Sequence, residues 1–67
     1  MGYNAKEIIK VLEENGWHLD RIKGNHHIYK NDLLKKSVPI PIHGKKDLGK
    51  GLFYRILKEC GIDRDDL

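Results

Sequence analysis

Residues 23–29 read Lys-Gly-Asn-His-His-Ile-Tyr, and this stretch decides the fold because it turns one predicted strand back along another. Gly24 and Asn25 both tolerate positive φ, so the pair predicts a two-residue hairpin turn. The turn places His26 and His27 at the end of a hairpin. Histidine can take and give a proton near neutral pH, so either residue is a candidate acid or base. Hairpin ends often carry polar residues, and a purely structural interpretation of the pair stays open at this point.

Three strands are expected around this turn. Residues 17–23 alternate imperfectly, with one face made by Trp17, Leu19 and Arg21. Residues 26–30 form the second strand, and a polar loop over residues 31–37 follows it. In residues 38–42 two prolines alternate with apolar side chains. Because proline cannot donate a ladder hydrogen bond, this third strand is expected at an edge of the sheet.

The phase of the second strand decides which histidine faces the core. If Ile28 faces the core, His26 and Lys30 share its side, whereas His27 and Tyr29 face away. A shift of one residue at the turn reverses this assignment, and the sequence alone leaves both phases open.

A helix is predicted on each side of the three strands. Asn4 and Glu7 have the spacing of a capping box, and Asn15-Gly16 ends the first helix. The second helix is expected over residues 51–60, ended by Gly61. Its apolar stripe comprises Leu52, Phe53, Ile56, Leu57 and Cys60. The order helix, three strands, helix predicts an α+β domain with two helices on one face of a three-stranded antiparallel sheet, which leaves the other face free for a partner.

Composition sets the class of protein. A chain of 67 residues is enough for one small domain, which we place over residues 1–67. A single cysteine excludes an intrachain disulfide and suits a reducing cytoplasm. The chain contains no apolar run long enough for a membrane span and no signal-peptide pattern. We therefore expect a cytoplasmic protein without a membrane partner.

Basic residues are concentrated in the middle of the chain. Residues 21–58 carry ten Lys and Arg against two Asp, a net charge of +8, whereas residues 1–20 carry −2 and residues 59–67 carry −3. A basic region of this kind favours a polyanionic partner, with nucleic acid first. Lysine is mostly exposed in any protein, so a solvated surface is the plain alternative.

Four collinear motifs resemble the HicA toxin family, also called YcfA-like mRNA interferases. Residues 6–17 resemble the family's opening helix closed by "NGW", and residues 23–27 resemble its "KGSHH" signature with Asn25 in the Ser position. Residues 38–43 resemble "VP.H", and residues 48–58 resemble "L..GTL..IL". Leu52 departs from the family's usual Thr, which removes a hydroxyl that would cap the helix or contact RNA.

This resemblance implies a fold like that of the double-stranded-RNA-binding domain, in the element order α-β-β-β-α. It also implies a ribosome-independent endoribonuclease that cleaves mRNA and inhibits translation, as the toxin of a type II toxin–antitoxin system. The implied partners are mRNA and a HicB-like antitoxin, without DNA binding by the toxin itself. The resemblance further implies that one histidine carries the catalysis, and its position in the motif assigns this role to His26, with His27 as the alternate.

The chemistry of RNA cleavage assigns roles to the residues around this pair. Cleavage needs a base for the 2′-hydroxyl, an acid for the leaving 5′-oxygen and positive charge for the phosphorane. We expect metal-independent transphosphorylation that leaves a 2′,3′-cyclic phosphate. The expected RNA-binding residues are Lys23, Asn25, His27, Tyr29, His43, Lys45, Lys46 and Lys50.

Other functions stay open. Four histidines raise the question of a metal, but with one cysteine and no carboxylate–histidine spacing we expect no metal and no cofactor. Cys60 lies on an apolar helix stripe, where packing is the simpler role. The alternatives are a non-catalytic RNA-binding module and an inactive domain that only binds a HicB-like partner.

Overall fold

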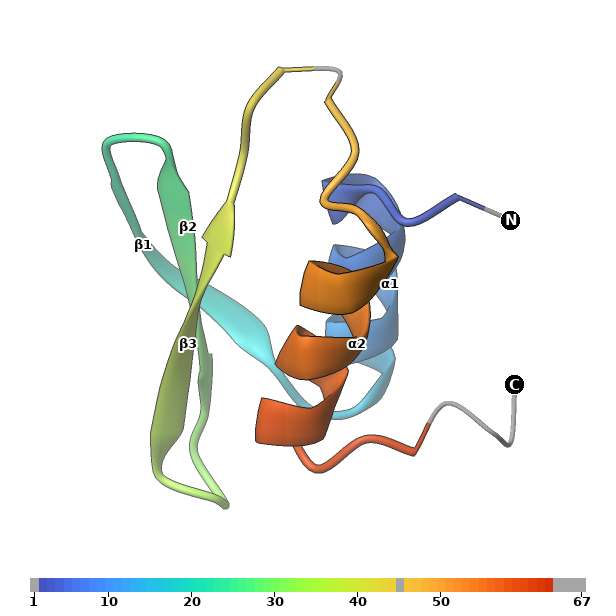
Figure 1. The fold of residues 1–67 in the computed structure, drawn as a ribbon. Helices are drawn as coiled ribbons and strands as arrows, with labels where there is room; N and C mark the ends of the chain where they lie inside the picture. The colour runs from blue at the N-terminus through green and yellow to red at the C-terminus, as the bar shows by residue number, and fades with distance from the viewer. Residues whose placement is uncertain (1, 45, 64–67) are drawn as a thin grey trace.

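The computed structural model describes residues 2–44 and 46–63. Helix α1 spans Ala5–Glu14, strands β1, β2 and β3 span His18–Lys23, His26–Asn31 and Lys36–Pro41, and helix α2 spans Lys50–Glu59. Both helices cover one face of the sheet and the other face is open, as Figure 1 shows. This confirms the predicted two-layer α-β-β-β-α arrangement, which matches the double-stranded-RNA-binding-domain-like fold.

The sheet is antiparallel with the strand order β1-β2-β3, so β2 is central and β3 is an edge strand as its prolines predict. The polar loop is shorter than expected, because β2 runs on through Asn31 and β3 begins at Lys36. The remaining turn has Lys35 in the left-handed region, at φ 54°. For the other elements, most of the predicted boundaries lie one residue away from the observed ones.

A β-bulge changes the faces of β1. Leu19 pairs with Tyr29 and Arg21 pairs with Ile28, which leaves Asp20 as the extra residue. Residues directly opposite in an antiparallel pair share a face. Arg21 therefore lies on the open face, and the prediction that it shares a face with Leu19 is wrong.

Tyr29 fixes the phase of β2. Its side chain is 4% exposed and lies in the core, whereas Ile28 is only half-buried and lies on the open face. The phase with Ile28 toward the core, one of the two left open by the sequence, is therefore excluded. Burying the larger ring removes more apolar area from water, which favours this phase.

The core lies between the helices and the helix-facing side of the sheet. It comprises Ile8, Val11, Leu12, Trp17, Tyr29, Val38, Ile40, Phe53, Ile56, Leu57 and Cys60. The stripe predicted for α2 is confirmed except at Leu52, which is 37% exposed. At the start of α1, the Asn4 side chain accepts a hydrogen bond from the Glu7 backbone N–H at 2.8 Å, so Asn4 is the cap as predicted.

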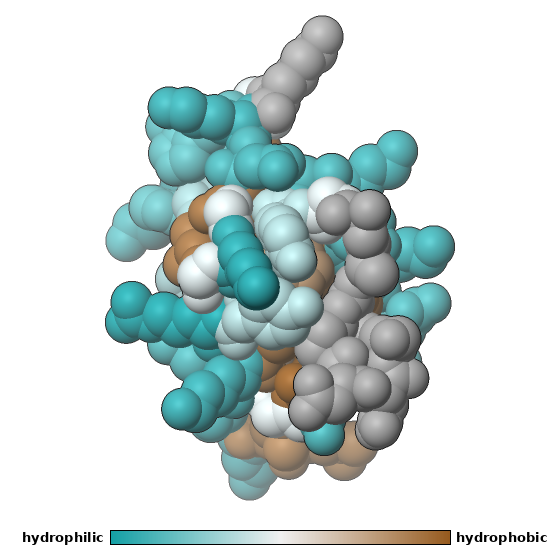
Figure 2. Space-filling model, turned by 45° about the vertical axis from the view of Figure 1, so that its right-hand side comes forward, coloured by the Kyte–Doolittle hydropathy of each residue, from teal (hydrophilic) through white to brown (hydrophobic). Residues whose placement is uncertain are grey.

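The two ends of the molecule differ in character. At the upper end in Figure 1 lie the β1–β2 turn, the segment from β3 to α2 and the first turns of both helices. We call this the hairpin end. Figure 2 shows hydrophobic surface at the opposite, lower end, where the β2–β3 turn lies and where Leu33 is 95% exposed.

Candidate functional site

The β1–β2 turn holds the histidine pair at the hairpin end. Lys23 pairs with His26 across the turn, so Gly24 and Asn25 are its two central residues, as predicted. Gly24 has φ +59° and comes first, which is the glycine position of a type II′ turn. A type II′ turn matches the twist of the two strands that it joins, so it fixes the backbone positions of His26 and His27.

His26 and His27 point to opposite faces of the sheet. His26 lies opposite Lys23 and Pro41, and its side chain is exposed on the open face. His27 lies opposite Ile40, which is fully buried, so His27 faces the helices and is half-buried. The two histidines therefore belong to two different surfaces, and their roles can be separated.

The open face around His26 is basic. Strand pairing adds Arg21 and Lys30 to the face that Lys23 and His26 occupy. Lys23 has no carboxylate partner among the residues that the structure describes. Its ammonium group is thus available to an anion beside the exposed imidazole.

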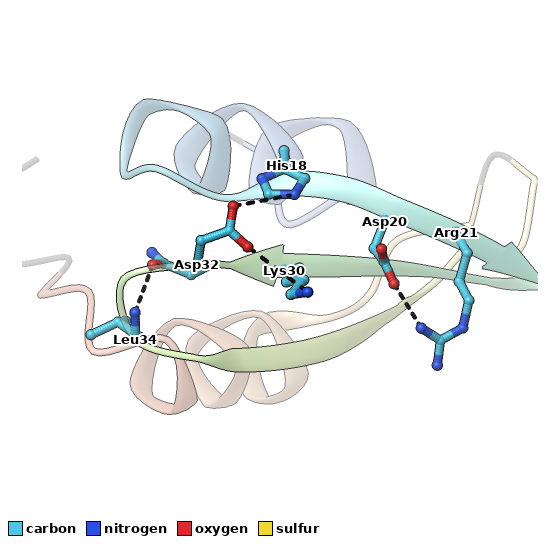
Figure 3. A network of polar contacts seen from close by, with 7 residues as sticks. His18, Asp20, Arg21, Lys30, Asp32 and Leu34 are labelled. Atoms are coloured by element: carbon cyan, nitrogen blue, oxygen red, sulfur yellow. Dashed lines mark hydrogen bonds and ion pairs between the residues drawn. The ribbon is translucent and has the colours of Figure 1, made fainter.

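Farther along the same face, the charges are partly neutralised. Figure 3 shows Asp32 between His18 and Lys30, with its carboxylate oxygens 4.0 Å from His18 Nε2 and 3.9 Å from Lys30 Nζ. Arg21 donates to the carboxylate of Asp20 at 2.7 Å. The three pairs of charges in this part of the face are largely solvent-exposed, and such pairs contribute little to stability. On this face, Lys23 is a cation beside His26 that no described carboxylate neutralises.

His27 lies in a groove between α1 and the upper ends of β2 and β3. We call this the α1 groove. It has a volume of about 730 Å³, and its sheet side is formed by His27, Ile42 and Gly44. Its helix side includes Glu7 and Lys10, neither of which the sequence singled out as functional. One feature of the sequence could have indicated this side of the groove. Lys6 and Lys10 are four residues apart, as are Ala5 and Ile9 beside them, so the two pairs lie along one face of the helix.

The basic segment that leads to α2 is anchored at both ends. Ile42 donates its backbone N–H to Asn25 at 2.7 Å, and Leu48 donates to Tyr3 at 2.9 Å. Between them, His43 and Lys46 are exposed and joined by a backbone hydrogen bond of 3.1 Å. These contacts bring His43 and Lys46 to the hairpin end with the β1–β2 turn. Lys45, which was also expected to bind RNA, lies outside the described residues.

Lys50 begins α2 at the same end of the molecule. The preceding cap residue is Gly49, which has no side chain to bond the first-turn N–H groups. Free N–H groups and the helix dipole at such a terminus favour an anion. Lys50 is exposed there, so its charge adds to that of the helix end.

Burial bears on two predicted roles. Tyr29 lies in the core, so its ring is not available to stack on a base, and the RNA-binding role expected for it is wrong. Cys60 is 3% exposed, and burial raises the pKa of its thiol to about 11. A thiol held in its neutral form is a poor nucleophile, which agrees with the packing role.

Two further features bear on function. Within residues 2–44 and 46–63, no three His, Cys, Asp or Glu side chains lie close enough together to bind a metal ion. No helix in this part of the chain is both long and apolar enough to cross a bilayer. Metal-independent chemistry stays a prediction.

Comparison with known proteins identifies two similarities. Residues 5–62 match the family model described as "HicA toxin of bacterial toxin-antitoxin". A protein of Pseudomonas fluorescens (strain Pf0-1) named "Probable mRNA interferase HicA" is 36% identical over 56 residues, which cover 84% of this chain and 90% of that protein.

Proposed function

This chain belongs to the HicA toxin family of bacterial toxin–antitoxin systems, and from this premise we propose that it is an mRNA endoribonuclease that inhibits translation. The cleavage does not require the ribosome. The observation that supports this proposal most directly is the exposed His26 on a basic sheet face, directly opposite Lys23, which no carboxylate pairs in the described part of the chain.

The proposed reaction is transphosphorylation within the RNA strand. The 2′-oxygen attacks the adjacent phosphorus and loses its proton, the bond from phosphorus to the 5′-oxygen breaks, and that oxygen gains a proton. The products are a 2′,3′-cyclic phosphate and a free 5′-hydroxyl. His26 transfers one of the two protons, which is worth about 10²–10⁴-fold in rate. Lys23 stabilises the negative charge of the phosphorane.

Lys46 and Lys50 bind the RNA backbone from the hairpin end in this proposal, together with the polar side chains of Asn25 and His43. Lys45, which lies outside the described residues, is proposed to bind it as well. His27 contacts RNA from the α1 groove and is the alternate catalytic residue. The anchoring of the segment before α2 supports this arrangement, because it keeps His43 and Lys46 beside the hairpin.

The remaining assignments complete the proposal. Residues 1–67 act as a single HicA-like domain in the cytoplasm, with mRNA as substrate and a HicB-like antitoxin as inhibitor. Neither a cofactor nor a metal takes part, and the toxin alone does not bind DNA or a membrane.

The test compares His26→Ala and His27→Ala with wild type, on a defined RNA in the presence of a chelator. His18→Ala is the matched control, because His18 is also exposed on the open face but lies beside Asp32, away from the turn. We expect wild type and His18→Ala to cut RNA and arrest growth, and His26→Ala to do neither while it stays folded. A 2′-deoxy nucleotide at the cut site abolishes cleavage.

Each other outcome has a defined meaning. If His27→Ala alone is inactive, catalysis occurs in the α1 groove and not on the open face. If cleavage persists at a 2′-deoxy site, the transphosphorylation mechanism is wrong. If wild type binds RNA without cutting it, the protein is an RNA-binding module.

A further inference from the structure

The α1 groove has the size and lining of a small-ligand site. Its volume of about 730 Å³ falls within the roughly 300–1,000 Å³ of pockets that hold small ligands. Ala5 and Ile9 of α1 and Ile42 after β3 give it apolar walls. A flat apolar ring with polar edges fits such walls better than an extended charged chain.

The charge of the groove argues against the RNA backbone as its occupant. Lys6 and Lys10 line it, but Glu7 and Glu13 line it as well, so the formal charges cancel. Two carboxylates repel phosphate, whereas the open face around Lys23 and His26 has an excess of positive charge. The backbone is therefore expected outside the groove, and a neutral part of the RNA inside it.

Glu7 is the distinctive group in the groove. Its side chain is half-buried, and within residues 2–44 and 46–63 no donor contacts its carboxylate. The Glu7 backbone N–H bonds to Asn4, but the return bond of a full capping box, from the Asn4 N–H to the Glu7 carboxylate, is not formed. An ionised carboxylate is purely an acceptor, so Glu7 offers its free oxygens to N–H donors of a ligand.

We infer that the α1 groove binds one unpaired nucleobase of the RNA substrate, and that Glu7 selects a base that carries an amino group. Adenine, cytosine and guanine each present an exocyclic amine to an acceptor. Uracil presents a single N–H between two carbonyl oxygens, which repel a carboxylate. This inference rests on the proposed function, because it names the base recognised beside the cleaved bond.

The position of the groove links it to cleavage. His27 lines the groove, and its neighbour His26 lies on the other face of the same strand, so the two surfaces meet across the hairpin end. Bases in a duplex are paired and stacked, and only an unpaired base can be turned into a pocket. The groove therefore selects single-stranded RNA near the bond that His26 cleaves.

The experiment measures the affinity of the full chain for two pentanucleotides, all cytosine or all uracil. Both carry 2′-O-methyl groups, which prevent transphosphorylation. Cytosine and uracil have similar size and stacking surface, so the ratio of the two Kd values isolates the amino group. We expect wild type to bind the cytosine oligomer about tenfold more tightly, the effect of one charge-assisted hydrogen bond.

Two variants with the same charge change separate selection from general electrostatics. Glu7→Gln is expected to bring the ratio of Kd values close to one, because an amide also donates to uracil. Glu14→Gln is the control, since Glu14 lies exposed on the same helix outside the groove. It is expected to keep the tenfold ratio, even though both variants bind all RNA slightly better. Fluorescence of Trp17, which is buried, checks that each variant is folded.

The outcomes distinguish this inference from the proposed function. If wild type binds and cuts RNA but Glu7→Gln keeps the wild-type ratio, the groove does not select the base and the nuclease proposal stands. If wild type cuts RNA but binds the two oligomers equally well, the groove does not select the base, and the nuclease proposal again stands. If wild type neither binds nor cuts any RNA, the proposed function itself fails.

Discussion

Asn31 is a buried polar side chain that ties together three parts of the fold. It is 5% exposed, its amide donates to the Asn15 carbonyl at 3.4 Å, and its side-chain oxygen accepts from the Leu34 N–H at 3.0 Å. It thereby joins the end of α1 to the β2–β3 turn. We predict that Asn31→Ala destabilises the protein without changing the activity of the molecules that remain folded.

The expected magnitude follows from these two contacts. Each hydrogen bond contributes about 1 kcal/mol net, so losing both costs about 2 kcal/mol. The 3.4 Å bond is long and contributes less, but the removed amide also leaves a gap among buried atoms. For a domain of this size, about 2 kcal/mol lowers Tm by about 10 °C.

Urea unfolding followed by Trp17 fluorescence measures this loss, because the chain has one tryptophan and it is buried. Asn25→Ala is the control, since Asn25 is exposed in the hairpin turn and is expected to change stability by less than about 0.5 kcal/mol. A loss below about 0.5 kcal/mol for Asn31→Ala would refute the reasoning, because the two bonds would then contribute nothing beyond what water supplies.

Two further predictions concern backbone and burial. Gly24→Ala is expected to cost about 1 kcal/mol because Gly24 has φ +59°, whereas Gly51→Ala, in helix α2 with open space around it, is expected to add up to about 1 kcal/mol. The midpoint of urea unfolding measures the change in stability of each variant. If both variants are less stable than wild type, the left-handed backbone of Gly24 is not what sets the two positions apart. Burial raises the pKa of Cys60 from 9.0 to about 11, so its contribution to stability is complete below about pH 9 and is lost as pH rises to about 11. Wild type should therefore lose more stability than Cys60→Ala over that interval; equal losses would show that the thiol is not coupled to folding.

The sequence predicted the element order, the edge position of β3 and the packing of both helices on one face of the sheet. These features depend on local signals, such as the Asn4 cap and the prolines of β3, and on the requirement that apolar faces be buried. The two-residue turn was also predictable, because Gly24 supplies a conformation that other residues avoid.

Other features depend on contacts between distant residues. The bulge at Asp20 adjusts β1 to β2, and nothing in the local pattern of β1 marks it. Tyr29 and Ile28 both suit a buried strand position, so only packing against the helices decides between them. The sequence likewise did not indicate that Glu7 and His27 line one groove, because the groove is formed by two elements that are separated along the chain.

The burial of Tyr29 also determines which of the two histidines is exposed to solvent. Neighbouring strand residues alternate faces, so the side chain that fills the core decides which histidine is presented to solvent and which is enclosed. A substitution that exchanged the core preference of positions 28 and 29 would exchange the environments of His26 and His27 while both imidazoles stayed in the chain. Under the proposed function, an interior residue that never meets the substrate thus decides which imidazole is the reactive group, and substitutions in the core can reassign the chemistry at the surface.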